Sequence, residues 1–314
     1  MNNPFQKKGL FFFNMTQQKK PTFIIIGAMK AATTSLYTYL KQHPDVFMTS
    51  IKEPMFFNNF QKETNFKIQG RKTKKITTFE QYYPLFDAVK NENAIGEASP
   101  SYISNKDCPS LIHKHLPNTK IIAVLRQPVA RAYSNYLHAR RADRESIADF
   151  ETAFNKEEER KAKNWSPLYH YKGKGYYTEQ LERYYNLFPK ENIKVLLFEE
   201  VVKNPIKVSQ EVFDFLNVDS SFTPDTSKKA NVSGTPKGLF GWLIMKLRYY
   251  NLIPNIQFSN YLPGFMIQFI FKAAYKKSNP LNIEIKNRLT NTFYKEDILK
   301  LEKLIEKDLQ HWLS

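Results

Sequence analysis

A lysine and three hydroxyl side chains follow an apolar run near the start of this 314-residue sequence, in an arrangement suited to holding an anion. The run Phe23–Ile26 has the length of a buried strand, and Gly27 after it permits a close backbone approach. Lys30 lies in the loop, and the hydroxyls that open the next helical pattern are Thr33, Thr34 and Ser35. Because the first amides of a helix lack intrahelical acceptors, the segment predicts a phosphate or sulfate site. An ordinary strand–turn–helix connection is the alternative.

A nucleotide-hydrolysing P-loop would use the same local structure but a different spacing. That motif requires G-x-x-x-x-G-K-[ST]. Counted from Gly27, Ala32 takes the place of the second glycine and Thr33 takes the place of the lysine. The only lysine of the loop, Lys30, lies in its middle, so the spacing disfavours a P-loop kinase.

A second pattern that could bind phosphate follows the apolar run Ile121–Leu125. Arg126 comes directly after this run, and Ser134 follows eight residues later within a helical pattern. A guanidinium offers a fork of donors to a terminal phosphate, and the serine adds a hydroxyl. The alternative is an arginine that pairs with a local acid. Ligands of parallel sheets bind at the carboxyl ends of strands, so Gly27 and Arg126 are predicted to face one crevice.

Strand and helix patterns alternate along the chain in a way that supports this placement. Four short apolar runs read as buried parallel strands: Phe23–Ile26, Ala94–Glu97, Ile121–Leu125 and Ile193–Phe198. Helical patterns lie between or after them: Thr34–Gln42, Pro128–Arg141, Tyr177–Leu187 and Asn204–Leu216. The alternation predicts an α/β fold with a central parallel sheet flanked by helices. The charged stretch Ala142–Trp165 is predicted to be a solvated helix pair.

These motifs resemble those of one enzyme family. The loop Gly27–Leu36 resembles the 5′-phosphosulfate-binding loop of sulfotransferases that use 3′-phosphoadenosine 5′-phosphosulfate (PAPS), and Ile121–Tyr136 resembles their 3′-phosphate signature. Three further segments are similar to the heparan-sulfate-type branch: Lys52–Phe57, Gly96–Tyr102 and Phe293–Trp312. The resemblance extends from Pro21 to Trp312 and implies a single α/β domain with the P-loop-NTPase-like sulfotransferase fold.

The resemblance also implies roles for individual residues. Lys30 would contact the bridging oxygen of PAPS and stabilise the leaving group, and Glu53 would take the proton of the acceptor. Further PAPS contacts would come from Ala31, Ala32, Thr33, Thr34, Ser35, Arg126 and Ser134, and from Lys229 and Asn231 in a segment that departs from the family form. The acceptor side would include Pro54, Met55, Phe56, Phe57, Ser99, Pro100, Ser101 and Tyr102. His115 is the rival base, but it precedes a strand and should lie at the end away from the phosphates.

Composition narrows the function classes without choosing among anionic partners. The formal net charge is +17, which favours nucleic acid, an anionic membrane, or an anionic nucleotide and glycan. No nucleic-acid-binding motif accompanies the charge, so we expect no nucleic acid partner, although a basic nucleic-acid-binding protein and a P-loop kinase remain the alternative readings. The single cysteine, Cys108, fits a reducing compartment, and the histidines lack metal-ligand spacing, so no metal is expected.

Three features of the sequence concern the cellular location of the protein: its first 20 residues, the length of its apolar runs, and residues 239–275. Residues 1–20 are predicted to be a flexible tail and 21–314 the sulfotransferase domain. No apolar run reaches the roughly 20 residues of a membrane helix, so the chain is predicted to be cytoplasmic. Residues 239–275 mix aromatic and basic side chains, which predicts either an insertion packed on the domain or a contact with a membrane surface. The expected acceptor is a hydroxyl or amine of a glycan, a glycolipid or another alcohol.

Overall fold

A computed structural model describes residues 19–61, 75–142, 144–227, 235–236, 238, 275–276 and 279–314 of the chain. Contacts divide these residues into two compact units. Unit 1 contains the described residues up to 125 together with 180–227, and unit 2 contains 126–142, 144–179 and those from 235 onward. The chain passes between the units after Leu125 and again within helix α9 (Tyr177–Tyr185).

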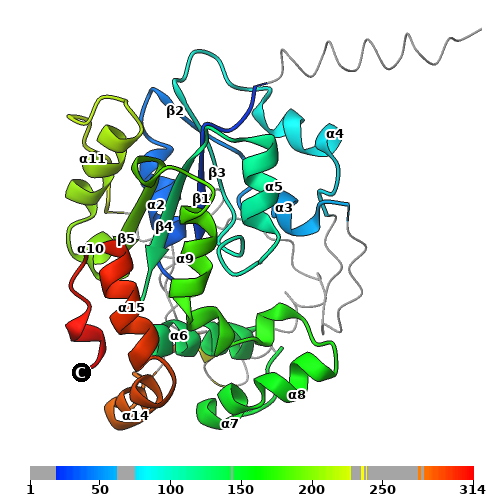
Figure 1. The fold of residues 1–314 in the computed structure, drawn as a ribbon, viewed down its shortest axis with the longest axis vertical. Helices are drawn as coiled ribbons and strands as arrows, with labels where there is room; N and C mark the ends of the chain where they lie inside the picture. Colours follow the sequence, from blue (N-terminus) through cyan, green and yellow to red (C-terminus); the bar gives the residue numbers. More distant parts are fainter. Residues whose placement is uncertain are drawn as a thin grey trace, which may run out of the picture. The chain divides into compact units, whose positions relative to one another are not determined.

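Unit 1 is built on a five-stranded sheet in which neighbouring strands run parallel, in the order β2–β3–β1–β4–β5 (Figure 1). The strands are β1 (Phe23–Gly27), β2 (Val46–Met48), β3 (Ala94–Ala98), β4 (Lys120–Leu125) and β5 (Ile193–Leu197). In the central strand β1, Ile24 is paired with Glu97 of β3 on one side and with Ile121 of β4 on the other. This arrangement confirms the predicted α/β class with a central parallel sheet.

All four predicted strands are present, and each differs from its prediction by one residue at one end. The apolar runs identified them because a strand covered on both faces needs apolar side chains at successive positions. Strand β2 was not predicted, because its three residues are too few to show an apolar run. Gly96 of β3 has no room for a side chain, since an added Cβ would lie 2.2 Å from the ring of Phe23.

The helices of unit 1 cover both sides of its sheet. They are α2 (Thr33–Leu40), α3 (Phe56–Asn59), α4 (Phe79–Tyr82), α5 (Cys108–His115), α10 (Phe198–Lys203) and α11 (Pro205–Phe215), with short 3-10 turns at Tyr83–Phe86 and Lys190–Asn192. Helix α2 packs on α11 and α5 packs on α3, and Figure 1 shows α5 and α11 on opposite sides of the strands. The predicted helices Thr34–Gln42 and Asn204–Leu216 correspond to α2 and α11.

Unit 2 is helical apart from a short antiparallel pair of strands. Its helices are α6 (Pro128–Arg141), α7 (Phe150–Asn155), α8 (Glu157–Ala162), α14 (Ile283–Phe293) and α15 (Lys295–Ile305), with 3-10 turns at Pro167–Tyr169, Gly173–Gly175 and Gln310–Trp312. Strands β6 (Thr235–Pro236) and β7 (Tyr275–Lys276) are paired. Helix α6 has the predicted bounds, and its start is capped by Gln127, whose side chain accepts a hydrogen bond from the amide of Ala130.

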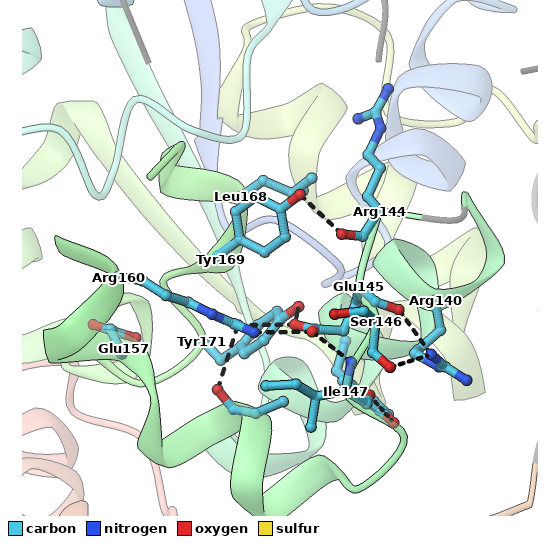
Figure 2. Close-up of polar contacts among 12 residues, drawn as sticks. Arg140, Arg144, Glu145, Ser146, Ile147, Glu157, Arg160, Leu168, Tyr169 and Tyr171 are labelled. Carbon is cyan, nitrogen blue, oxygen red and sulfur yellow. Dashed lines mark hydrogen bonds and ion pairs between the residues drawn. The ribbon is translucent and has the colours of Figure 1, made fainter. Parts of the chain in front are cut away.

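Between Ala142 and Trp165 a solvated helix pair was predicted. The two helices are confirmed, but some of the charged side chains are buried and not solvated. Helices α7 and α8 are present, but Glu145, Glu157 and Arg160 are buried. In Figure 2, dashed lines join the Glu145 carboxylate to the Arg160 guanidinium and to the Tyr171 hydroxyl. This charged stretch therefore contains an internal ion pair, which the sequence pattern did not indicate. Glu145 and Arg160 are 15 residues apart and meet only in the folded chain.

Several predictions lie outside the described residues. They concern most of the 1–20 tail, Lys229, Asn231 and the segment 239–275 apart from Tyr275. The domain boundaries therefore stay predictions. Among the residues that the structure describes, no helix combines the length and the apolar character needed to cross a bilayer.

Candidate active site

The loop between β1 and α2 has the conformation expected of a close backbone approach. Gly27 ends the strand, and a Cβ added to it would lie 2.4 Å from the Ile103 side chain. The amide of Ala28 donates to the carbonyl of Val124 on β4, at 2.6 Å. Lys30 and Ala32 adopt left-handed conformations, with φ of 69° and 65°. Because left-handed backbone is costly for residues with a Cβ, the loop is held in shape by its surroundings.

The start of α2 is open to an anion. Ala32 occupies its N-cap position and provides no side-chain cap, and the first turn contains no acidic side chain. The first turn consists of the hydroxyl residues Thr33, Thr34 and Ser35, of which Thr33 is buried and the other two are half-buried. The absence of a capping side chain leaves the first amides of this helix available to a ligand, as the predicted phosphosulfate site requires.

The segment that carries Glu53 is fastened to the end of β3, the neighbour of β1. The amide of Glu53 donates to the carbonyl of Ala98, the last residue of β3, at 3.0 Å. Its side chain is 44% exposed and forms an ion pair with Lys52 at 2.5 Å. The carboxylate is thus accessible to a bound acceptor. Lys30 follows the carboxyl end of β1, as predicted for this loop, and the Glu53 segment is hydrogen-bonded to the carboxyl end of the neighbouring strand β3, a position that was not predicted.

Two of the predicted acceptor residues, Ser99 and Tyr102, are fully buried. The Ser99 hydroxyl accepts the amide of Met55 at 3.0 Å, and the Tyr102 hydroxyl accepts the amide of Phe57 at 3.2 Å. Their direct contact with an acceptor stays a prediction, but the structure shows a second role for them. Both hydroxyls hold the backbone that follows Glu53.

A buried carboxylate that was not among the predicted site residues completes this arrangement. Glu97 of β3 is fully buried and accepts the hydroxyls of Ser99 at 2.9 Å, Tyr102 at 3.0 Å and Tyr82 at 2.9 Å. Burial raises the pKa of Glu97 to about 7, while the three hydroxyl hydrogen bonds act to lower it. The available signal was an acidic residue inside an apolar strand, which indicates a buried charge with dedicated partners.

The remaining predicted acceptor residues lie beside an aromatic cluster. Pro54 is buried, Met55 and Ser101 are half-buried, and Pro100 is buried. Phe56 and Phe57 are fully buried, and Phe56 stacks on Tyr82 at 4.2 Å between ring centroids. The rival base His115 contacts Phe60 and Phe79 at the end of α5, before β4 begins. Burial lowers the pKa of His115. Because His115 precedes β4, it lies at the amino-terminal edge of the sheet, whereas Gly27 lies at the carboxyl-terminal edge.

Unit 2 holds the predicted 3′-phosphate residues. Arg126 and Ser134 are both half-buried, and they flank the first two turns of α6. The carbonyl of Arg126 accepts the Tyr177 hydroxyl at 2.8 Å. The next residue, Gln127, donates to the Thr290 hydroxyl at 2.6 Å and to the carbonyl of Trp312 at 3.3 Å. The closing helices of the chain therefore fix the backbone from which Arg126 extends.

No group of three or more potential metal ligands occurs among the described residues. The cationic side chain of Lys30 and the open amides of α2 are the features of this region that suit an anion. The expectation that the protein works without a metal stays a prediction.

Comparison with known proteins gives consistent results. A family model described as "Sulfotransferase family" matches residues 21–224. A crystal structure of a sulfotransferase from Alicyclobacillus acidocaldarius is 31% identical, covers 94% of this chain and 100% of its own, and superposes with a TM-score of 0.73. The membrane-associated sulfotransferase kil1 of Dictyostelium discoideum is 22% identical over 92% of this chain and 66% of its own length.

A relative from mouse, heparan sulfate glucosamine 3-O-sulfotransferase 3B1, is 29% identical over 68% of this chain and 50% of its own length. This chain therefore spans about two thirds of kil1 and half of the mouse enzyme. The family model covers β1 to α11, which includes the Gly27 loop, the Glu53 segment and the start of α6.

Proposed function

This chain belongs to the sulfotransferase family, and we propose that it moves a sulfuryl group from PAPS to a hydroxyl or amine of a carbohydrate or glycolipid acceptor. The observation that carries the proposal is the uncapped start of α2 behind a loop with one lysine, beside the fastened Glu53 segment. The uncapped helix start follows β1, and the segment with the accessible carboxylate is hydrogen-bonded to the end of the neighbouring strand β3, which supports an anion site with a base near it. The sulfated carbohydrates named for similar relatives support the acceptor class.

The residues of the chain divide the chemistry between them. The α2 amides and the hydroxyls of Thr33, Thr34 and Ser35 would hold the 5′-phosphosulfate. Lys30 would stabilise the negative charge that develops on the leaving group, which is the step where a preorganised donor has the largest effect. Arg126 and Ser134 would hold the 3′-phosphate through charge-assisted hydrogen bonds. PAPS supplies the sulfuryl group when it is bound.

Glu53 would accept the proton of the acceptor hydroxyl or amine. Its exposed carboxylate is the only one of the segment Lys52–Phe57. The ion pair with Lys52 restrains the side chain on the solvent side. A general base must lie within hydrogen-bonding reach of the proton that it removes, and an accessible carboxylate on a fixed backbone meets this requirement.

Calorimetry with the desulfonated product, adenosine 3′,5′-bisphosphate, tests the proposal. We expect binding that needs no magnesium and that exceeds the binding of ATP with magnesium. Arg126→Ala should weaken the binding of the bisphosphate by about 1.5–3 kcal/mol, because a charge-assisted contact is lost. Glu53→Gln is the matched control, since it should lower turnover and leave this affinity unchanged. A preference for magnesium-ATP would overturn the proposal in favour of a kinase.

We also propose a cytoplasmic location with peripheral membrane contact through residues 239–275. The proposal rests on their mixture of aromatic and basic side chains and on the similarity to a membrane-associated relative. Replacement of Phe240 and Trp242 by serine should reduce cosedimentation with anionic liposomes and leave nucleotide affinity unchanged. If the unchanged protein binds neither anionic nor neutral liposomes at low salt, the membrane contact is ruled out.

A further inference from the structure

We propose that Glu97, Ser99 and Tyr102, here named the Glu97 network, hold the backbone of the Glu53 segment in its working conformation. Glu97 would thus be a positioning residue that acts on sulfuryl transfer through Glu53 without touching the acceptor. The structural part of the inference, that the network holds the segment, rests on contacts within unit 1. The catalytic part, that this affects sulfuryl transfer through Glu53, rests on the proposed function.

The Glu53 segment is tied to the end of β3 at three alternate amides. Glu53 donates directly to the carbonyl of Ala98 at 3.0 Å. Met55 donates to the Ser99 hydroxyl at 3.0 Å, and Phe57 donates to the Tyr102 hydroxyl at 3.2 Å. Two of the three ties thus depend on side-chain hydroxyls, which can rotate and must be oriented by another group.

Glu97 provides that orientation. A hydroxyl has one proton to donate and lone pairs to accept with. The Ser99 and Tyr102 protons go to the two oxygens of the Glu97 carboxylate, at 2.9 Å and 3.0 Å. Their lone pairs are therefore left to face the amides of Met55 and Phe57. Within the described part of the chain, every hydrogen bond to this carboxylate comes from a neutral hydroxyl.

The backbone of the Glu53 segment has an unfavourable conformation that depends on these hydrogen bonds. Glu53 and Met55 have φ of 62° and 54°, in the left-handed region. This conformation is unfavourable for residues with a Cβ, and it persists only where the surrounding contacts impose it. The ties at Glu53, Met55 and Phe57 bracket both left-handed residues. Loss of one hydroxyl tie should therefore free the segment locally, without opening the core.

Tyr82 provides a matched control within the same site. Tyr82 and Tyr102 are both fully buried and donate to the same oxygen of Glu97, at 2.9 Å and 3.0 Å. Only the Tyr102 hydroxyl also accepts a backbone amide of the Glu53 segment. If both hydroxyls only stabilised the buried carboxylate, Tyr82→Phe and Tyr102→Phe should have the same effect on the Glu53 segment. The proposed role predicts an effect for Tyr102→Phe alone.

Hydrogen exchange tests the structural part without any acceptor. In Tyr102→Phe and in Ser99→Ala, we expect the amides of a peptide that covers residues 52–59 to exchange about tenfold faster than in the unchanged protein. In Tyr82→Phe, we expect exchange of this peptide within about twofold of the unchanged protein. Equal exchange in the two tyrosine variants would overturn the inference.

Steady-state kinetics test the catalytic part, with radiolabelled PAPS and with heparan sulfate and its N-desulfated form as probe acceptors. We expect Tyr102→Phe to lower kcat about tenfold, with unchanged affinity for adenosine 3′,5′-bisphosphate, and Tyr82→Phe to stay within about twofold. In the Glu53→Gln background, Tyr102→Phe should cause no further loss, because both act through one group. An equal loss in both backgrounds would show that Tyr102 does not act through Glu53.

The outcomes separate the two proposals. If the unchanged protein sulfates neither probe and does not bind the bisphosphate, the proposed function is wrong and the catalytic part of the inference falls with it. The exchange measurement still decides whether the Glu97 network holds the segment. If Glu53→Gln lowers kcat and Tyr102→Phe does not, the function stands and the positioning role is wrong.

Discussion

Two of the buried carboxylates among the described residues, Glu97 and Glu145, have partners that differ in kind. Glu97 in unit 1 is fully buried and, within the described part of the chain, accepts hydrogen bonds from neutral hydroxyls. Glu145 in unit 2 has a side chain that is 1% exposed and is paired with the Arg160 guanidinium, at 2.8 Å and 2.9 Å to its two oxygens (Figure 2). The Tyr171 hydroxyl and the amide of Ile147 also donate to Glu145, at 2.8 Å and 3.0 Å.

The difference indicates what each cluster does. The Glu145–Arg160 pair joins the segment after α6 to α8, and the guanidinium also lies over the rings of Trp165 and Tyr169, both at 5.3 Å. A buried pair of this kind fixes where charged segments can pack. Glu97 receives its hydrogen bonds from hydroxyls among the described residues, and two of these hydroxyls also accept backbone amides of the Glu53 segment. Burial raises the pKa of Tyr171, and Glu145 raises it further, so its hydroxyl stays a donor.

The backbone shows the same contrast. Among the described residues of unit 1, four of the six left-handed residues lie in the two loops proposed to do chemistry, namely Lys30, Ala32, Glu53 and Met55, and the other two are Gln61 and Asn217. In unit 2, the left-handed residue Glu306 ends helix α15, which is an ordinary way for a helix to stop, and Asn164 follows α8. Unit 1 thus carries strained backbone at its candidate site, and unit 2 carries ionic contacts that stabilise its packing. Four predictions test this contrast.

The largest expected effect is on stability in unit 2. Arg160→Met would leave the Glu145 carboxylate buried without its cation, which should lower the free energy of unfolding by about 3–5 kcal/mol. Urea denaturation at neutral pH measures this loss. Lys163→Met is the control, because Lys163 pairs with Glu159 on the surface and should matter little. A loss below about 1 kcal/mol in Arg160→Met would contradict the structural role.

The second prediction is the reverse case, a large effect on turnover with little effect on stability. Lys30→Ala should lower kcat at least about a hundredfold, because one preorganised donor at a developing charge contributes roughly 3–4 kcal/mol. Its melting temperature should change little, since the side chain is only half-buried. Lys41→Ala, at the other end of α2, is the matched control and should retain turnover. Near-normal turnover of Lys30→Ala would remove Lys30 from the mechanism.

The third prediction uses pH to test the buried carboxylate of unit 1. The pKa of Glu97 is raised from 4.5 to about 7, so the folded state binds more protons than the unfolded state between these values. Stability from this group is therefore highest below pH 4.5 and falls as pH rises towards 7, by up to about 3 kcal/mol. The surrounding groups Tyr82 and Tyr102 have pKa values raised well above 10 and do not titrate in this window.

Urea denaturation of the unchanged protein and of Glu97→Gln across pH 4–8 measures this dependence. Other groups titrate in both proteins, so the difference between the two curves isolates Glu97. Relative to the unchanged protein, Glu97→Gln should gain stability as pH rises from 4.5 to 7. A difference that does not vary with pH would show that Glu97 has no raised pKa.

The smallest expected effect concerns backbone strain. Ala32 has φ of 65°, where glycine pays no steric cost. Ala32→Gly should raise the free energy of unfolding by about 0.5–1 kcal/mol, after the entropic cost of glycine is subtracted. Thr38→Gly inside α2 should instead lower it by a similar amount. Equal destabilisation by both substitutions, measured without nucleotide, would show that the loop is unstrained.

Much of the fold could be predicted because its signals are local. The runs at Phe23 and Ile121 needed only neighbouring apolar residues to indicate strands, and Pro128 marked the start of α6 where the structure places it. The Gly27 loop could be recognised for the same reason, since a strand, a small-residue turn and a helix start are consecutive in the chain. Strand β2 was missed because three residues provide no pattern.

The partners of buried charges could not be predicted. Glu97 receives its hydrogen bonds from Tyr82, which lies 15 residues earlier, and from Ser99 and Tyr102 after the strand. Glu145 and Arg160 are likewise 15 residues apart, within a stretch whose pattern indicated solvated helices. Charge and periodicity describe which face of an element is polar, but not which polar group meets another inside the fold.

The sequence by itself determined the α/β class, the order of the main strands and helices, and the loop after the first strand where an anion could bind, whereas the role of Glu53 came only from the family resemblance. These features follow from side-chain periodicity and from the conformational limits of neighbouring residues, which act over a few positions. Only the tertiary structure decided that Glu97 is fully buried among hydroxyls, and that Lys30, Ala32, Glu53 and Met55 adopt left-handed backbone. Both depend on contacts between distant segments, because a buried polar group or a strained residue is stable only when the surrounding fold provides its partners.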